Sequence, residues 1–407
     1  MLEERTVKSE KGKLDHIVEK IFWLLVFFFL ASIKLRNVFL GLTFIFFVIN
    51  KLVKKDFTIP KNKFNKYLGL FFLFSILSML KASNLELSIS HLVSPLIRYL
   101  AFYFIAMDLI DQDNINKYLN IILLSNLVLI SYGLYVDYFT KGEFFYRSNG
   151  IGTVSSFMII LFTTLVVYKK TKVYKKIVLA LGSIGSLIAL ITTYSRGAFL
   201  AFGGAILVWI TLVIWEKLSS KIGSKKLIAS IIVIIICIMT VTGLLLPEKL
   251  INRFERIKNI EANRSLKTRI EMYKSSLTMI KENPLLGVGI GNYKPNYVSY
   301  IEESNISKSS VDLGHDHPHN LFLYIAVEQG IISLIIFLMI YFKSYQLAVR
   351  NYFNQQEKSY FGLVLIGILT ALFIHSLVDT TVRYGHVGFY VILFGVFNLK
   401  IRSWNLK

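Results

Sequence analysis

The sequence predicts an all-α protein that crosses a membrane about twelve times, because its composition is strongly apolar and its apolar runs repeat. Of its 407 residues, 54% are apolar and only 17% are charged, and the mean hydropathy is +0.57. A soluble domain carries about 25% charged residues. Runs of roughly 17 to 25 apolar residues recur between short polar links, which is the pattern of membrane-spanning helices. The composition therefore excludes a set of soluble domains.

The apolar runs give the expected position of each span. The first follows about twenty polar and charged residues without a small-residue cleavage site, so we expect a retained span and not a signal peptide. Cys237, the single cysteine, lies in the ninth run and is expected to be a buried hydrophobic residue. The expected spans are 17–33, 38–51, 67–81, 97–111, 118–138, 152–168, 177–193, 198–215, 227–246, 321–343, 361–379 and 386–399.

Lysine and arginine residues are concentrated in alternate links, which indicates the orientation. The net charge is +21, but the cations lie between apolar spans and not along one face of a soluble domain, as nucleic-acid binding would need. With a cytoplasmic N-terminus, all cytoplasmic links except DQDNINK are strongly basic, as the positive-inside rule requires. We therefore predict that both termini are cytoplasmic, that the protein contacts membrane lipids and that it binds no nucleic acid.

One connection, from Pro247 to about Asn320, is far longer than the others. Long loops are usually functional or disordered, and this one contains an amphipathic helix that would lie against the membrane or cover a cavity. We divide the chain into spans one to nine (1–246), a partly helical outer loop (247–320), and spans ten to twelve with the tail (321–407). The apolar stripe of the amphipathic helix consists of Leu266, Ile270, Tyr273, Leu277 and Ile280.

Three of the seven histidines lie in HDHPHN, residues 315–320, where this loop meets the tenth span. Histidine is a common zinc ligand, but zinc sites usually draw ligands from separated elements, and Pro318 stiffens this run. A solvated loop without a function is another alternative. We favour proton transfer by His319, which is expected at the first turn of the span and therefore rigidly held. A helix N-terminus disfavours the imidazolium form, which suits a general base.

Two arginines on the outer side are candidate phosphate-binding residues. Arg196 lies in TTYSRGAF between spans seven and eight, where small neighbours imply a tight link. Arg269 lies on the amphipathic helix, one turn before Tyr273. Each could instead be a surface residue, Arg196 by extending to lipid headgroups. Guanidinium groups bind phosphate oxygens in bidentate fashion and stay charged, so two of them with a neutral base would suit a phosphate leaving group attacked by a hydroxyl.

Three other features also have structural explanations. GVGIG, residues 287–291, lacks the GxGxxG spacing and a preceding strand, so we expect a flexible turn and not a dinucleotide loop. His375 and Asp379, four residues apart near the end of span eleven, could be a structural pair or could support a catalytic residue. Glu328 inside span ten would be costly unless paired, so we expect it to face the bundle.

The motifs around these residues resemble the O-antigen ligase and polymerase superfamily. The resemblance rests on SRGA around Arg196, on the stretch from Arg269 and Tyr273 to ENPLLGVGIGNY, and on His319-Asn320 before Gly330. The long outer loop and the twelve-span count match the ligase branch. The motifs cover roughly residues 190 to 335. One departure is Ser333, where the family often has Gly, Thr or Tyr.

The resemblance implies an O-antigen ligase, which is a membrane glycosyltransferase of the C type. Such ligases transfer a glycan from undecaprenyl diphosphate to a sugar of a lipid A–core acceptor at the periplasmic face. This would place the protein in the bacterial inner membrane. The family's histidine corresponds to His319, and its two arginines correspond to Arg196 and Arg269. The resemblance gives no role to His315 or His317.

The residues predict an inverting reaction without a metal or another cofactor. Many lipid-donor transferases hold a divalent metal with acidic residues of the first outer loop, but here that loop is KLRN and has no carboxylate. Cations of the protein must then neutralise the leaving diphosphate. Candidate supporting residues are Lys81, Arg98 and Arg147 at outer span ends, together with Asn320, Tyr273, His317 and Asp379.

Three other functions stay open. An O-antigen or polysaccharide polymerase would use the same donor with a lipid-linked acceptor, and a protein O-glycan ligase would use a protein acceptor. A polysaccharide or lipid transporter would involve no covalent chemistry. Transporters usually show internal repeats and interrupted helices at the midplane, whereas this sequence has no fixed repeat and its polar residues cluster at the outer ends of the spans.

Overall fold

The computed structural model describes residues 12–60, 62–111, 113–140, 142, 144–145, 148–218, 264–304, 312–353 and 360–404. Over these ranges all regular secondary structure is helical and no strand occurs. In this part of the chain eight helices are long and apolar enough to cross a membrane, and two shorter apolar helices, Tyr360–Ser376 and Gly385–Lys400, accompany them. The protein is therefore an all-α, multi-pass membrane protein, as predicted.

The helices follow the predicted runs closely. The N-terminal half comprises α1 (Lys13–Ala31), α2 (Ile33–Lys54), α3 (Phe64–Ser78), η1 (Met79–Lys81), α4 (Leu85–His91), η2 (Leu92–Ile97), α5 (Arg98–Leu109), α6 (Ile115–Phe139), α7 (Asn149–Tyr168), α8 (Val173–Thr193) and α9 (Arg196–Leu218). The C-terminal half comprises α12 (Arg264–Glu282), α13 (Tyr293–Glu303), α14 (Leu321–Phe353), α15 (Tyr360–Ser376), η4 (Thr381–Arg383) and α16 (Gly385–Trp404).

Eleven of the twelve expected spans fall on these helices, and the ninth, 227–246 with Cys237, lies outside the described residues. The span expected at 97–111 was placed too short, because α4, η2 and α5 form one apolar stretch from Leu85 to Leu109. Polar residues concealed its start in the sequence. One of them, Ser88, is buried and donates to the carbonyl of Ile290 at 2.7 Å.

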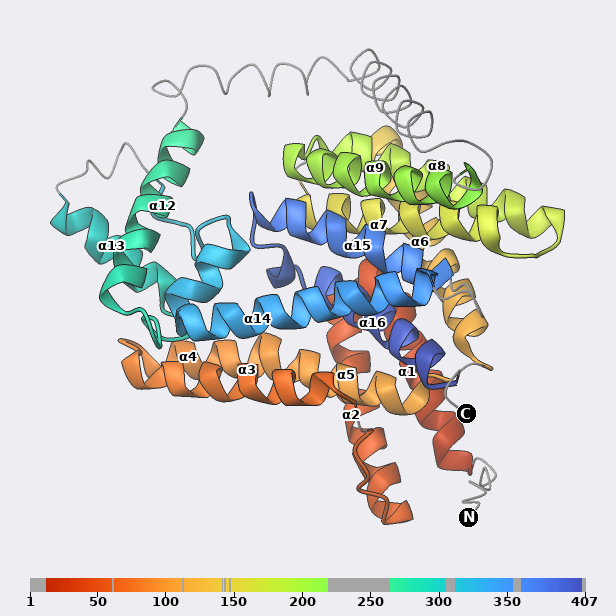
Figure 1. The fold of residues 1–407 in the computed structure, drawn as a ribbon, viewed down its shortest axis with the longest axis horizontal. Coiled ribbons are helices and arrows are strands. Elements are labelled where there is room, and N and C mark those ends of the chain that lie inside the picture. Colours follow the sequence, from red (N-terminus) through yellow and green to blue (C-terminus); the bar gives the residue numbers. More distant parts are fainter. Residues whose placement is uncertain are drawn as a thin grey trace.

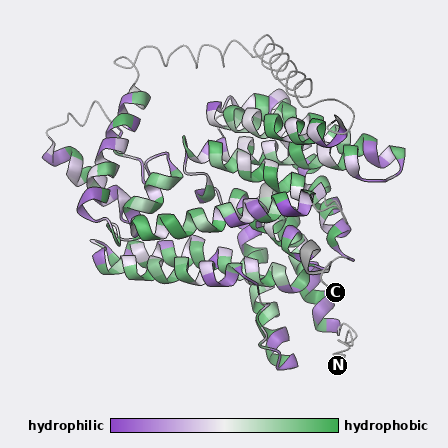
Figure 2. Ribbon diagram, viewed as in Figure 1, coloured by the Kyte–Doolittle hydropathy of each residue, from purple (hydrophilic) through white to green (hydrophobic). Residues whose placement is uncertain are grey.

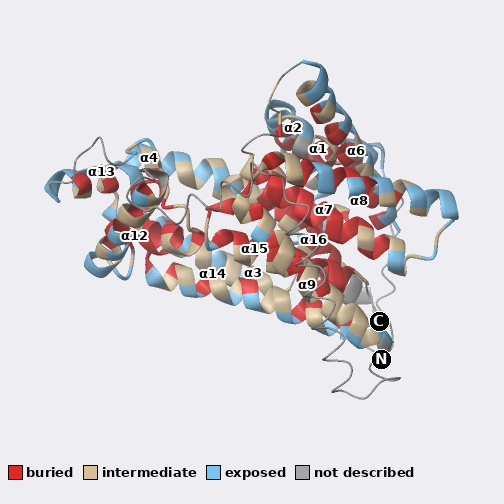
Figure 3. Ribbon diagram, turned by 90° about the horizontal axis from the view of Figure 1, so that it is seen from above, coloured by how far each residue is buried: buried red, intermediate tan, exposed pale blue. Residues whose placement is uncertain are grey.

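The spans form a bundle with α12 and α13 at one end (Figure 1). α7 packs against α8, α9 and α15, and α14 packs between α3 and α15. α1 and α2 form a hairpin that runs steeply across these helices in Figure 1. Figure 3 shows that buried residues run through α7, α15 and α16, whereas α1, α2 and α13 carry many exposed ones. The core therefore centres on α7, α15 and α16, and the buried faces of α1, α5 and α6 complete it.

α14 is broken at Gly330, whose φ of +81° and ψ of 170° are not helical. Beside the break, the N–H of Ile331 donates to the carbonyl of Pro284, and the N–H of Val288 donates to the carbonyl of Val327, both at 2.8 Å. The glycine-rich turn thus supplies hydrogen-bond partners that the broken helix lacks. The turn is tightly packed against α14, so the expectation that it is flexible was wrong.

α12 confirms the predicted amphipathic helix, but it packs through a different face. Met272 and Met279 are buried together with the small residues Ser275 and Ser276, whereas Leu277 of the predicted stripe is 61% exposed. The small serine side chains allow α13 and α14 to approach α12 closely. Close packing therefore decided which face of α12 is buried, and the size of the apolar side chains alone did not. Figure 2 shows hydrophilic residues on α12 and α13, in contrast to the largely hydrophobic α14.

Candidate active site

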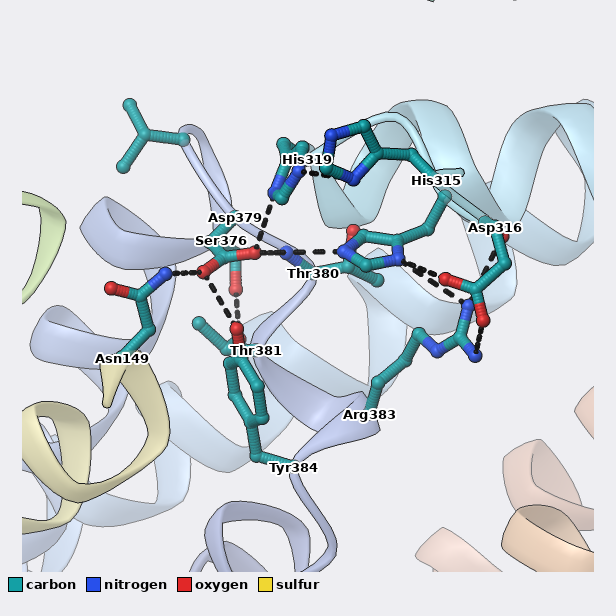
Figure 4. A network of polar contacts seen from close by, with 12 residues as sticks. Asn149, His315, Asp316, His319, Ser376, Asp379, Thr380, Thr381, Arg383 and Tyr384 are labelled. Atoms are coloured by element: carbon teal, nitrogen blue, oxygen red, sulfur yellow. Dashed lines mark hydrogen bonds and ion pairs between the residues drawn. The ribbon is translucent and has the colours of Figure 1, made fainter. Parts of the chain in front are cut away.

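Segments that are far apart in the sequence meet at the α12 end of the bundle. They are the histidine-rich segment 315–319, the turn that follows α15, and the first residues of α7 and α9. Figure 4 shows Asp379 at the centre of their polar contacts, with Asn149 on one side and the histidines on the other. Polar groups of this density within a membrane protein mark a functional site by default.

Asp379 is a carboxylate with an exposed fraction of only 1%. Its Oδ1 accepts a hydrogen bond from the backbone N–H of Thr380 at 2.8 Å and lies 3.2 Å from Nδ1 of His319. Its Oδ2 accepts from Nδ2 of Asn149 at 2.6 Å and from the hydroxyl of Tyr384 at 3.0 Å. Because both oxygens are held, the carboxylate can orient the imidazole of His319.

His319 turns toward Asp379 from a left-handed backbone conformation, with φ of +51°. We expected His319 in the first turn of the span, but it lies just before α14. The helix begins one residue later because the side chain of Asn320 caps it. That side chain accepts from the N–H groups of Phe322 and Leu323, both at 3.0 Å. Since a carboxylate can only accept, Nδ1 of His319 is assigned as the donor, and in the neutral imidazole Nε2 then carries the lone pair. This is the tautomer of a general base.

Electrostatics keep Asp379 ionised. Burial raises its pKa, but the hydrogen bond with His319, together with smaller electrostatic contributions from His375 and His319, outweighs burial and holds the pKa well below its usual range. The side chain of His375 instead contacts the hydroxyl of Thr153, with Nδ1 at 2.7 Å from the oxygen. Of the two explanations for His375 and Asp379, the geometry favours support of another residue, since the carboxylate contacts His319.

A third histidine connects His319 to the surface. Nε2 of His319 lies 3.3 Å from Nδ1 of His315, whose Nε2 lies 3.3 Å from Oδ2 of the exposed Asp312. Burial is the main cause that lowers the pKa of His315, and the neighbouring His319 lowers it further. His315 is therefore neutral at pH 7 and able to accept a proton. A continuous path of side chains thus runs from buried Asp379 to solvent.

His317 is held by a second carboxylate. Nδ1 of His317 lies 2.7 Å from Oδ1 of Asp316, and the guanidinium of Arg383 donates to both Oδ2 and the backbone oxygen of Asp316. The hydrogen bond with His317 and the charge of Arg383 hold the pKa of Asp316 well below its usual range, despite burial. Nε2 of His317 then lies 3.9 Å from Oδ1 of Asp379.

His317, His319 and Asp379 could together hold a metal ion, because one ligand atom from each lies within 4.8 Å of the others. Zinc accepts imidazole nitrogens and a carboxylate oxygen. In the sequence, the histidine run alone offered no ligand from a separate element, which zinc sites usually have. Asp379, from the turn after α15, supplies such a ligand. The reaction without a metal accordingly stays a prediction, which a chelator tests.

The two predicted arginines lie beside this network. Nη1 of Arg269 on α12 donates to the backbone carbonyl of Val378 at 3.2 Å, directly before the buried carboxylate. Arg196 begins α9 immediately after Ser195, whose hydroxyl donates to Oδ1 of Asn149 at 2.7 Å. The fold therefore brings the residues of three separate motifs to one end of the bundle.

Two supporting candidates also belong to the network. The hydroxyl of Tyr273 donates to the backbone carbonyl of His319 at 3.4 Å. Burial raises the pKa of Tyr273, so its hydroxyl stays protonated. Besides capping α14, Asn320 donates through Nδ2 to the carbonyl of Leu377 at 3.1 Å and so joins the histidine segment to the turn after α15.

The other basic candidates lie elsewhere. Lys81 is exposed at the end of η1, and Arg98 is the first residue of α5. Within the described ranges, no recorded contact joins either of them to the histidines. Arg147 lies outside the described residues. The structure thus separates Lys81 and Arg98 from the groups that surround His319.

An apolar cavity of about 470 Å³ adjoins the histidine cluster. Arg383 lines the cavity and also contacts Asp316, so the cavity reaches the site at this residue. Glu328 lines it as well, with an exposed fraction of 0% and Oε1 accepting from the N–H of Tyr293 at 3.2 Å. The expectation that Glu328 faces the bundle is confirmed. The apolar wall includes Leu68, Phe71, Leu100, Phe337, Leu369 and Val391.

Asn149, Arg383 and Tyr384 were not among the predicted site residues. Each is a single polar residue outside a motif, so the spacing of the motifs carries no information about them. A weak signal exists for Arg383 and Tyr384, because VDTTVRYGH between two apolar runs holds a carboxylate, three hydroxyls, a guanidinium and an imidazole in one short link. Asn149 begins a span directly after an outer link, as Arg196 does.

A family model described as O-antigen ligase matches residues 181–338. The matched region includes Arg196, Arg269 and His319, and the resemblance that the motifs indicated is thereby confirmed for this part of the chain. No curated protein matches the chain.

Proposed function

We propose that this member of the O-antigen ligase family transfers a glycan from undecaprenyl diphosphate to a sugar hydroxyl of a lipid A–core acceptor. The family match supports a ligase or polymerase function in O-antigen assembly. The observation that carries the proposal is the orientation of His319, whose Nδ1 contacts Asp379 at 3.2 Å while Nε2 keeps its lone pair. An imidazole held in this way can remove a proton from an attacking hydroxyl.

The reaction is a single displacement. The acceptor hydroxyl oxygen forms a bond to the anomeric carbon of the donor sugar, and the bond from that carbon to the diphosphate oxygen breaks. The diphosphate leaves with the electron pair, and the anomeric configuration inverts. The hydroxyl proton moves to Nε2 of His319, and Asp379 stabilises the resulting imidazolium. Arg196 and Arg269 neutralise the charge that develops on the leaving group.

His315 provides an exit for the proton. Its Nδ1 lies 3.3 Å from Nε2 of His319, and its other nitrogen faces the exposed Asp312. After the displacement the proton can pass to His315 and then to solvent, which returns His319 to its basic form. His315 must also move aside or share its place with the acceptor, because both groups approach the same nitrogen.

The apolar cavity supports a donor with an isoprenoid chain. Its volume of about 470 Å³ accommodates part of such a chain, and its wall is mainly aliphatic and aromatic. Arg383, where the cavity meets the histidine cluster, is a cation suited to the diphosphate at the head of the chain. We place the site on the periplasmic side of the inner membrane, where no ATP is present and the donor must arrive already activated.

Reconstituted transfer tests the proposal directly. Purified protein is given glycan-linked undecaprenyl diphosphate and lipid A–core, and attachment of the glycan is measured. His319→Ala should lower the rate by about 10²- to 10⁴-fold, the usual contribution of a general base. His16→Ala, the same change at an exposed histidine of α1, should leave it unchanged. Transfer that persists in His319→Ala would refute this assignment.

Two further arms separate the alternatives. Replacing lipid A–core with a second lipid-diphosphate glycan should abolish product, whereas a polymerase would extend the chain. Addition of EDTA should not change the rate. Loss of activity in EDTA that zinc restores would show that His317, His319 and Asp379 hold a metal instead of forming a base and its support.

A further inference from the structure

We propose that Arg36 is the centre of a second binding site, which takes the phosphate group of a membrane lipid. Arg36 lies in the first turn of α2 and has an exposed fraction of 6%. Its Nε and Nη1 atoms are buried and have no hydrogen-bond partner in the part of the chain that the structure describes. A buried guanidinium without acceptors is strongly unfavourable. The arrangement is therefore incomplete without an anion.

The groups around Arg36 supply no counter-charge. The charged residue that acts on it most is Arg98, which carries the same sign. The neighbouring Tyr99 is already engaged, because its hydroxyl donates to the carbonyl of Val382 at 2.7 Å. Among the described residues, no carboxylate forms a recorded ion pair with Arg36. Lys34, exposed on the same turn of α2, adds a further positive charge.

The guanidinium of Arg36 nevertheless has a shaped place in the fold. Gly385 leaves room for it, since a Cβ there would lie 2.9 Å from Nη2. The ring of Phe389 lies beneath it, with its centroid 5.7 Å from Cζ. Backbone and ring thus hold one side of the group, while two nitrogens of the guanidinium, Nε and Nη1, have no acceptor among the described residues.

The surroundings favour a lipid as the source of the phosphate. Three apolar residues next to Arg36 on α2 are well exposed: Ile33 at 66%, Leu35 at 41% and Val38 at 54%. On a membrane helix such side chains contact acyl chains. An amphiphile could place its chains along them and its phosphate on Arg36, with Lys34 and Arg98 nearby. Among the described residues no hydrogen bond or ion pair joins Arg36 to the histidine segment, although Gly385 beside it directly follows Tyr384 of the active site.

Thermal unfolding of the purified full chain in detergent tests the site. Addition of phosphatidylglycerol should raise the midpoint of the parent protein by roughly 2–4 °C. Diacylglycerol, which lacks the phosphate, and pyrophosphate, which lacks the chains, should not. Arg36→Met should lose most of the rise, Arg36→Lys should keep part of it, and Arg350→Met, at an exposed arginine of α14, should keep all of it.

The parent protein offers a measurement that does not depend on how the variants fold. Phenylglyoxal modification of Arg36, followed at the peptide level, should be slowed by phosphatidylglycerol and not by diacylglycerol. An equal midpoint rise in Arg36→Met and the parent, or unchanged modification of Arg36, would overturn the site. An Arg36-dependent effect of pyrophosphate alone would overturn the lipid as its ligand.

Discussion

Asp379 and Glu328 are two buried carboxyl groups with opposite surroundings. Asp379 accepts hydrogen bonds at both oxygens, from His319, Asn149, Tyr384 and a backbone N–H. Glu328 accepts at Oε1 from the N–H of Tyr293, and its Oε2 has no partner. The first group is held by side chains of separate elements, whereas the second is held by the backbone beside the glycine-rich turn.

The difference shows what each carboxyl group does. The donors of Asp379 come from α7, the histidine segment and the turn after α15, so the group ties together the elements that carry the site. It can therefore orient a residue that changes its charge during a reaction. Glu328 joins the start of α13 to α14, next to the break at Gly330, and this role is structural. Burial alone does not distinguish the two; the identity of the donors does.

The largest expected effect is that of Asp379→Asn. The amide can donate to Nδ1 of His319, which would move the imidazole proton to Nε2 and remove the base. We expect turnover to fall by about 10²- to 10⁴-fold with little change in KM. Glu328→Gln, at an equally buried carboxyl group that lines the cavity but does not contact His319, should lower turnover far less. Equal losses in the two variants would break the comparison.

Gly330→Ala should disturb the packing of the glycine-rich turn against α14, next to Glu328. A Cβ there would lie 2.0 Å from the carbonyl oxygen of Leu285, and φ is +81°. We expect the free energy of unfolding to fall by about 2–4 kcal/mol, seen as a lower thermal midpoint. Gly203→Ala, where a Cβ meets nothing within 4 Å, should leave the midpoint unchanged or slightly raised. A normal midpoint in Gly330→Ala would contradict the packing of the turn.

Tyr384→Phe should have a moderate effect on turnover. Burial raises the pKa of Tyr384, so its hydroxyl stays protonated and donates to Oδ2 of Asp379. Removing one of the two donors to this oxygen loosens the carboxylate, and we expect turnover to fall by about 3- to 10-fold. Tyr132→Phe, at a tyrosine that is 57% exposed, is the control. An unchanged rate in Tyr384→Phe would show that Asn149 alone positions the carboxylate.

The smallest expected effect is a pH dependence of stability through His315. Burial lowers its pKa in the folded protein, so the unfolded chain binds more protons once the pH falls below about 6.5. Stability is therefore full above this pH and declines as the pH drops toward the folded pKa. Asp316 and Asp379 have pKa values below the usual range in the folded protein. Their contribution to the free energy of unfolding is therefore lost only below about pH 4.

Thermal midpoints measured between pH 7 and pH 5 test this dependence. His315→Gln should make the decline less steep without abolishing it, because this side chain no longer binds a proton in either state while other buried histidines remain. His16→Gln, at the exposed histidine of α1, should retain the slope of the parent protein. Identical slopes in the parent protein and His315→Gln would mean that another group causes the decline.

Sequence motifs identified the candidate site residues, whereas the apolar pattern did not predict which face of α12 is buried. His319, Arg196 and Arg269 could be identified because each lies in a short pattern with characteristic neighbours. The buried face of α12 could not, since its apolar stripe ran through Leu277 while packing used Met272 and the serines beside it. The packed glycine-rich turn was misjudged for the same reason: its partners lie on α14, and no local pattern describes a contact with another helix.

The sequence by itself determined the membrane class, the positions of most spans and the residue types that carry the proposed chemistry. These follow from local properties, because a long apolar run must be helical in a bilayer whatever its neighbours are. The tertiary structure alone decided that Asp379 contacts Nδ1 of His319, and that Arg36 has no acceptor among the described residues. Both depend on distances between segments that are remote in the chain, and a linear pattern does not encode them.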